Sequence, residues 1–316
     1  MPFELFLFAY AVLGPLHYLT EINWLESKNY FINSKKWFWV FIVLAIVISI
    51  PFLLRQSALL PLKNNSFATT IYNLFKGQAN LAILIAFTFS IILINFIKNT
   101  HIILGLLVSI ICSYFLLKYI AFASIIVGVF IPTIIHVYVF TLLFMILGTI
   151  NNRTRAGIIA IILLITIPIT IYLSNIQSNN YALGENIKNI FLESKFHFLS
   201  QRIANSIGAI ENRQFYFLSP IGIKIQIFIA FCYTYHYLNW FSKTNIIGWN
   251  KNISKTKFVS ILILWGICIF LYWYNNKTGF AFLFLLSFLH VLLEFPLNIK
   301  SIVGIYKGIL PKNTSH

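Results

Sequence analysis

The chain alternates between long apolar runs and short polar connections. Nine apolar runs can be drawn, at about residues 3–21, 37–54, 80–97, 101–117, 120–149, 156–174, 215–240, 257–274 and 280–305. Most are near the roughly 17–25 residues that an α-helix needs to span a bilayer. Only Lys118 and Tyr119 separate the fourth run from the fifth, so the pattern predicts eight or nine transmembrane helices. We expect an all-α, polytopic integral membrane bundle that forms one transmembrane domain over residues 1–316.

The longest connection, about residues 175–214, has a different pattern. From Ile187 to Ile210 apolar residues recur near helical spacing, and polar residues such as Lys188 and Arg202 lie between them. This pattern predicts one amphipathic helix at the membrane interface, over about residues 184–212. Such a helix is suited to act as a lid or a lateral gate for an apolar ligand. A plain surface connector is the alternative interpretation.

The composition agrees with a membrane protein. Hydrophobic residues make up 59% of the chain and charged residues 9%, a balance that excludes an ordinary soluble domain. The net charge of +16 does not predict nucleic-acid binding, because the Lys and Arg residues lie between the apolar runs. Cys112, Cys232 and Cys268 all fall within apolar segments, which argues against a disulfide framework.

The basic residues of the short connections predict the orientation. With nine helices and the N-terminus outside, one side of the membrane carries Lys28, Lys35, Lys36, Lys98, Arg153, Arg155, Lys243, Lys251, Lys255, Lys257, Lys300, Lys307 and Lys312. The other side carries Arg55, Lys63, Lys76, Lys118 and Lys277 on short loops. Cytoplasmic loops carry the excess of Lys and Arg. We therefore expect a multi-pass protein of the cell membrane with its N-terminus outside and its C-terminus in the cytoplasm.

Two His-x-x-x-Glu turns inside apolar runs are the main clue to chemistry. They are His17–Glu21 in the first run and His290–Glu294 in the last. Seven histidines and seven glutamates, with no aspartate, would give roughly 0.15 such pairs by chance. A spacing of four places both side chains on one helix face. Ionisable groups in hydrocarbon need a partner, a water-filled cavity or a metal ion.

Four histidines fall within predicted spans, and we expect at least three of them to share one site. They are His17, His136, His236 and His290, on helices that run in the same direction in the nine-helix arrangement. Their levels differ by roughly 10–15 Å on straight, untilted helices, a difference that helix tilt can largely remove. Imidazole suits iron, zinc, copper and haem iron.

Nearby residues complete this hypothesis. Glu21 and Glu294 are candidates for additional ligands or for acceptors of the second ring N–H of a ligating histidine. Cys232, one turn before His236, is a further candidate in the same role. The aromatic residues Tyr18, Tyr233, Tyr237 and Trp240 are candidates for a pocket that holds a long apolar ligand. The alternative for these aromatic residues is an interfacial belt.

Four short patches resemble the Brp/Blh-type beta-carotene 15,15'-dioxygenases. Gly14-Pro15-Leu16-His17, with Glu21 after it, is similar to the Gly-x-Pro-His and acid of the family's first helix, in rearranged order. Ile134-Ile135-His136 resembles the family's Ile-Ile-His turn. His236 lies in an aromatic-rich stretch like the family's His-x-x-x-His helix, with Cys232 in place of the earlier histidine. Leu289-His290, followed by Glu294-Phe295, is similar to the last helix of the family.

The resemblance implies a compact membrane protein that holds iron through intramembrane histidines and cleaves a carotenoid to retinal. It implies that His17, His136 and His236 are iron ligands and that His290 is a ligand or a pocket residue. We therefore predict an Fe(II)-dependent membrane oxygenase whose long apolar, lipid-like substrate arrives from the bilayer. The residues leave three alternatives open: a bis-histidine haem-b electron carrier, a transporter or proton relay, and a structural membrane subunit.

Overall fold

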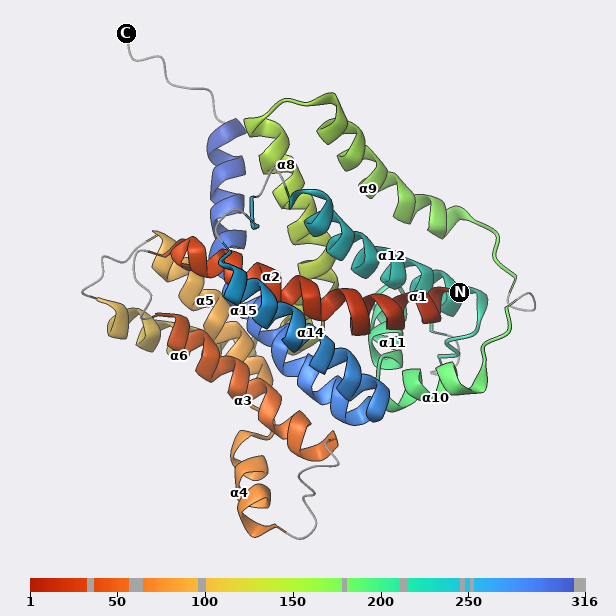
Figure 1. The fold of residues 1–316 in the computed structure, drawn as a ribbon, viewed down its shortest axis with the longest axis horizontal. Coiled ribbons are helices and arrows are strands. Elements are labelled where there is room, and N and C mark those ends of the chain that lie inside the picture. Colours follow the sequence, from red (N-terminus) through yellow and green to blue (C-terminus); the bar gives the residue numbers. More distant parts are fainter. Residues whose placement is uncertain are drawn as a thin grey trace.

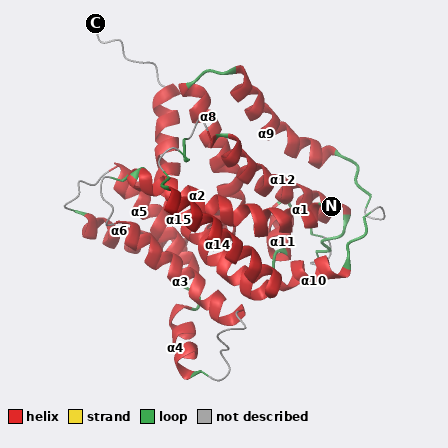
Figure 2. Ribbon diagram, in the orientation of Figure 1, coloured by secondary structure: helices red, strands yellow, loops and turns green. Residues whose placement is uncertain are grey.

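The protein is all-helical in the part of the chain that the structure describes. The computed structural model describes residues 1–32, 37–56, 65–95, 101–177, 181–210, 215–244, 248–250 and 253–309. None of the residues in these ranges forms a strand (Figure 2). The expected all-α bundle is confirmed. The predicted basic residues Lys35, Lys36, Lys63, Lys98, Lys251 and Lys312 lie outside the described residues.

Each of the nine predicted runs contains a helix. The first half of the chain forms α1 (Pro2–Phe8), the π-helical η1 (Ala9–Leu13), α2 (Gly14–Ser27), the short 3₁₀ turn η2 (Asn29–Phe31), α3 (Phe38–Gln56), α4 (Ser66–Phe75), α5 (Ala79–Asn95) and α6 (Ile102–Tyr119). The second half forms α7 (Ala123–Ile125), the π-helical η5 (Ile126–Phe140), α8 (Thr141–Asn151), α9 (Arg155–Leu173), α10 (Glu185–Glu193), α11 (His197–Ser206), α12 (Pro220–Ser242), α14 (Lys255–Tyr274) and α15 (Asn276–Ile309).

Seven helices of the described residues are long and apolar enough to cross a membrane. The count becomes eight if α4 and α5, which are bent by 52° at their junction, together form one span. The predicted run at 215–240 is α12, which is 23 residues long but is not among the seven. Polar side chains such as Gln226, His236 and Asn239 lower its hydropathy. The described residues therefore indicate a membrane protein with seven or eight spans by length and composition, against the eight or nine predicted from the apolar runs.

Helix α15 is the central element of the bundle (Figure 1). It contains 34 residues, so it is roughly 51 Å long at 1.5 Å per residue. It packs against α2, α3, α5, α8 and α14, which surround it. Helices α9 and α14 lie at the periphery and expose most of their apolar side chains. A helix that is apolar on its exposed faces is suited to lipid contact.

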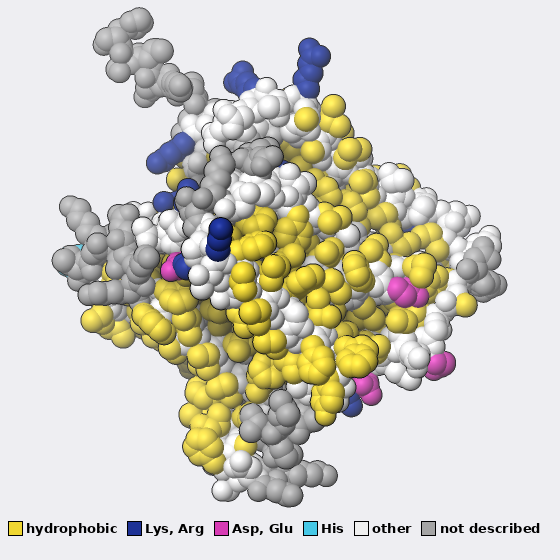
Figure 3. Space-filling model, viewed as in Figure 1, with side chains coloured by type: hydrophobic (Ala, Val, Ile, Leu, Met, Phe, Trp, Pro, Cys, Tyr) yellow, Lys and Arg dark blue, Asp and Glu magenta, His cyan; other side chains and the backbone are white. Residues whose placement is uncertain are grey.

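The face of the molecule seen in Figure 3 has an apolar middle and charged ends. In Figure 3, hydrophobic side chains cover the centre of the molecule, Lys and Arg gather at its upper and upper-left end, and acidic side chains lie mainly at the lower right. This distribution is typical of a protein that spans a bilayer. Which end faces the cytoplasm stays a prediction.

The amphipathic segment is two short helices and not one. Helix α10 ends at Glu193 and α11 begins at His197, and Lys195 between them has a left-handed backbone with φ 65°. The turn lets two aromatic rings face the same neighbour. The ring centroids of Phe191 and Phe3 are 4.9 Å apart, and those of Phe196 and Phe6 are 4.7 Å apart. The single predicted helix was therefore wrong, because burial of two rings against α1 requires a break.

The tight connection between α14 and α15 leads to a stability prediction. A Cβ at Gly279 would lie 2.2 Å from the backbone Cα of Tyr272, so Gly279→Ala has to move one helix away from the other. We expect a loss of about 1–3 kcal/mol, as for other overpacked sites. The measurement is thermal unfolding in detergent. Gly266→Ala on α14 is the matched control, because nothing lies within 4 Å of a Cβ there. Equal stability of the two variants would contradict the prediction.

Candidate metal centre

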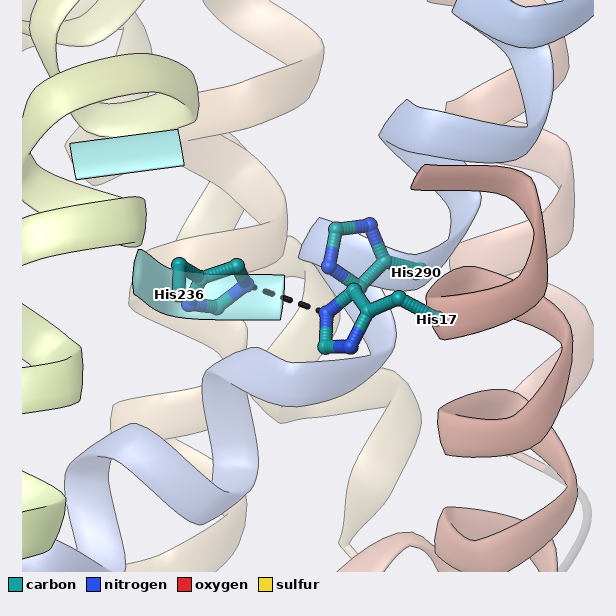
Figure 4. A group of neighbouring side chains, drawn as sticks. All are labelled: His17, His236 and His290. Carbon is teal, nitrogen blue, oxygen red and sulfur yellow. Dashed lines mark hydrogen bonds between the residues drawn. The ribbon is translucent and has the colours of Figure 1, made fainter. Parts of the chain in front are cut away.

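Four histidines from four helical elements meet inside the bundle. His17 comes from α2, His136 from η5, His236 from α12 and His290 from α15, and each is at most 7% exposed. The Nε2 atoms of His17 and His236 are 3.0 Å apart, and so are those of His136 and His290. Figure 4 shows the rings of His17, His236 and His290 turned toward one another. All four histidines named by the sequence therefore belong to one cluster.

Irregular helices help to position two of these side chains. His17 follows the π-helical η1 and the Gly14-Pro15 pair, and His136 lies within η5, a π-helical stretch of 15 residues that contains Pro132. A π-helix pairs residue i with i+5, so it changes the direction of side chains relative to a regular helix. Such segments often mark functional sites. Sequence reasoning missed both π-helical segments, and the prolines inside the apolar runs were the available signal.

In three of the four histidine rings, Nδ1 faces a polar group outside the cluster. The Nδ1–H of His290 donates to the backbone carbonyl of Ser287 at 2.8 Å. The Nδ1 of His236 is 2.7 Å from the Thr141 hydroxyl, and the Nδ1 of His136 is 3.1 Å from the Glu294 carboxylate. The Ser287 carbonyl accepts from Nδ1–H of His290 and so fixes the tautomer that leaves its Nε2 as an acceptor, whereas the Thr141 hydroxyl can donate to Nδ1 of His236 or accept from it. The Nε2 atoms of all four rings face the centre of the cluster, where they form two N–H···N hydrogen bonds.

The two glutamates of the His-x-x-x-Glu turns hold different positions. A carboxylate oxygen of Glu21 lies 3.0 Å from Nε2 of His17 and 3.9 Å from Nε2 of His290, on the inner side of the cluster. Glu294 approaches His136 from outside the cluster and does not pair with His290, its neighbour in sequence. In the second turn the carbonyl of Ser287 occupies Nδ1 of His290, and Glu294 lies beside a histidine of another helix.

These residues fit a divalent metal ion. The ligand atoms of His17, His236 and His290 all lie within 4.8 Å of one another, as do those of His136, His290 and Glu294. The Nε2 atoms that share protons in this structure are the donors that a divalent ion would bind once those protons are released. The Glu21 oxygen is close to His17 but makes no hydrogen bond within the described chain, so a cation would satisfy it.

Three of the four predicted pocket aromatics touch the histidine rings. Tyr18 stacks on His290 with centroids 4.4 Å apart, and the ring centroids of Tyr237 and Trp240 lie 5.1 and 5.6 Å from that of His17. The Tyr18 and Tyr237 hydroxyls are hydrogen-bonded at 2.6 Å, so they satisfy each other. This pair leaves mainly apolar ring surface beside the histidines.

Gly14 leaves room for that tyrosine pair. A Cβ at Gly14 would be 3.1 Å from the Tyr18 hydroxyl and 3.3 Å from the Tyr237 hydroxyl. Trp240 is fixed by its indole N–H, which donates to the Thr20 hydroxyl at 3.0 Å. Tyr233 lies one layer further out, with its ring centroid 6.2 Å from that of Tyr237. These contacts hold the rings next to His17 and His290 in fixed orientations.

Cys232 lies apart from both groups of possible ligands among the described residues. Its thiol is buried in the apolar cluster that includes Tyr233 and Ile229, although it is only one turn from His236. A role for Cys232 at the metal stays a prediction that no contact in the described chain supports.

Comparison with known proteins assigns the chain to no family. No protein-family model matches the chain, and neither the curated proteins nor the solved structures include a match to it. The fold and the site define the chain as a polytopic helical membrane protein with a buried cluster of four histidines and two glutamates.

Proposed function

We propose that this protein is an integral membrane oxygenase that holds Fe(II) and acts on a long apolar substrate such as a carotenoid. The observation that carries the proposal is the convergence of four imidazole nitrogens and one carboxylate oxygen inside a membrane bundle. Nitrogen ligands with a single carboxylate suit non-haem iron. When bound, Fe(II) supplies the one-electron chemistry that lets O₂ react with an organic substrate.

The spacing of the histidines favours a bare ion over haem. In a bis-histidine haem, the porphyrin plane lies between the two imidazoles. Here the facing Nε2 atoms of His136 and His290 are 3.0 Å apart, as are those of His17 and His236. No porphyrin fits between nitrogens at that distance. In the described residues, two sets of three ligand atoms that share His290 are each compact enough to hold a bare ion.

The surroundings of the cluster support an apolar substrate. Aromatic rings follow one another from the α10–α11 segment to His17: Phe196 contacts Phe6 at 4.7 Å, Phe6 contacts Tyr233 at 5.1 Å, and Tyr233 contacts Tyr237 at 6.2 Å between centroids. Tyr237 in turn contacts His17. These packed aromatic side chains give the site apolar surroundings, which suit a polyene substrate and exclude water.

In this function some residues would bind the metal ion and others would orient the histidines that bind it. His17, His136, His236 and His290 would hold the ion, and Glu21 would complete the ligand set on the inner side of the cluster. Thr141 and the carbonyl of Ser287 orient His236 and His290 through Nδ1, and Glu294 would do the same for His136, whose Nδ1 lies 3.1 Å from its carboxylate. Cleavage of a double bond by O₂ places one oxygen atom on each of two carbonyl products, so a symmetric carotene gives two molecules of retinal.

Expression in β-carotene-accumulating cells tests the proposal. We expect the cells to lose colour and to yield extractable retinal, and the purified protein to contain iron. The matched control is a His17→Ala/His236→Ala double variant, which removes one of the facing pairs and is expected to leave the cells coloured. The measurements are pigment extraction with chromatography and metal analysis of detergent-purified protein. Unchanged pigment together with iron-free wild-type protein would overturn the proposal.

A further inference from the structure

A stripe of polar residues follows one face of α15 beyond the histidine cluster. Its members, spaced three or four residues apart along the helix, are Ser287, His290, Glu294, Asn298 and Ser301. This spacing keeps them on one face. The last four are at most 3% exposed. The residues between them, such as Leu293 and Phe295, are buried and apolar. The stripe therefore extends the polar interior of the site by about two turns of helix.

Asn298 is the unexplained member of this stripe. It is 1% exposed, and neither its amide nitrogen nor its amide oxygen has a hydrogen-bond partner within the described ranges. By contrast, the Ser301 hydroxyl donates to the Leu297 carbonyl on the same helix at 2.9 Å. A primary amide has two donors and an acceptor oxygen, and buried amides in proteins are almost always partnered.

A second buried polar atom without a hydrogen-bond partner lies one turn away. Glu294 is 3% exposed, and its Oε2 atom makes no hydrogen bond among the residues described, although it is 3.1 Å from Nδ1 of His136. Side chains four residues apart on a helix are about 5–6 Å apart at Cβ. A small ligand with both donors and acceptors that lay between the two side chains would satisfy both groups. Water has this chemistry, whereas a cation would need more oxygen ligands than these two side chains supply.

We propose that Glu294 and Asn298 enclose a bound-water site, and that this water couples Asn298 to the metal centre. The water accepts from the Asn298 amide and donates to the Glu294 carboxylate, which it holds against the His136 ring. Asn298 is then a positioning residue that acts through Glu294 and His136. The coupling rests on the proposed metal site, but the water site itself does not.

The test compares wild-type protein with Asn298→Leu, which keeps the side-chain size and removes both polar atoms. A structure at a resolution that shows ordered water is expected to place water between Asn298 and Glu294, and to lose it in Asn298→Leu. Loaded with Co(II), Asn298→Leu is expected to show a changed ligand-field spectrum and roughly 10-fold weaker binding. Asn298→Ser, which leaves room for water and keeps a hydroxyl, is expected to restore the spectrum. Ser301→Ala is the control, because its hydroxyl is satisfied within α15.

The outcomes separate this inference from the proposed function. An Asn298 amide bonded to protein groups without water would overturn the water site. An unchanged Co(II) spectrum in Asn298→Leu would overturn the coupling. Wild-type protein that shows the water but takes up no metal would overturn the proposed function and the coupling, while supporting the water site.

Discussion

Purified His290→Ala protein is expected to contain at most about a tenth of the metal found in the wild type. His290 belongs to both groups of possible ligands, and its Nε2 is 3.0 Å from that of His136 and 3.9 Å from the Glu21 carboxylate. The substitution therefore removes the one imidazole that both groups of possible ligands in the described residues share. Metal analysis of detergent-purified protein, together with circular dichroism, measures the effect. The helical content should stay near that of the wild type.

His197→Ala is the matched control for this experiment. His197 lies at the start of α11 and is in neither group of possible ligands in the described chain. Its ring centroid is 4.4 Å from that of the neighbouring Phe198. We expect His197→Ala to keep the wild-type metal content. If His290→Ala and His197→Ala retained equal amounts of metal, the four-histidine centre would be wrong.

The main features of the fold could be predicted from the sequence. Long apolar runs are a strong signal because the bilayer admits few alternatives to helices. Each of the nine runs contains a helix in the structure. The four histidines were identifiable for a related reason. A residue that is costly to bury stands out clearly in an apolar segment, and His17, His136, His236 and His290 all meet in the bundle.

The details that decide the chemistry could not be predicted in this way. The π-helical η5 changes the direction of His136, and hydropathy does not distinguish a π-helix from an α-helix. Glu294 pairs with His136 across the bundle. Spacing within α15 indicates only that Glu294 shares a face with His290. The break at Lys195 depends on where Phe191 and Phe196 meet α1, which is a tertiary contact.

The central position of α15 explains how one helix serves both the fold and the site. It packs against α2, which carries His17 and Glu21, and it also contacts η5, which carries His136. Its own His290 and Glu294 both contact His136 of η5, one at each ring nitrogen. His290 also faces His17 and Glu21 of α2, on the inner side of the cluster. The first and last spans thus supply both carboxylates, and these have unequal roles.

Substitution of the two glutamates is expected to separate those roles. Glu21 lies on the inner side of the cluster, 3.0 Å from Nε2 of His17, so Glu21→Gln removes a negative charge next to the ion. We expect metal affinity to fall at least about 10-fold and the ligand-field spectrum of the Co(II) protein to change. Glu294→Gln keeps an oxygen that can accept from Nδ1–H of His136. We expect that variant to bind metal within about threefold of the wild type.

Glu294→Leu completes the comparison, because it removes the acceptor and keeps an apolar side chain of similar length. Without the carboxylate 3.1 Å from its Nδ1, a metal-bound His136 would have no acceptor for its Nδ1–H, so we expect metal affinity to fall by about 10–100-fold. Competition titration of Co(II) with a chelator measures all three variants on one scale. The expected order of affinity places Glu294→Gln next to the wild type, with Glu21→Gln and Glu294→Leu well below it. A Glu294→Gln variant weaker than Glu21→Gln would reverse the assignment, making Glu294 the direct ligand and Glu21 the support.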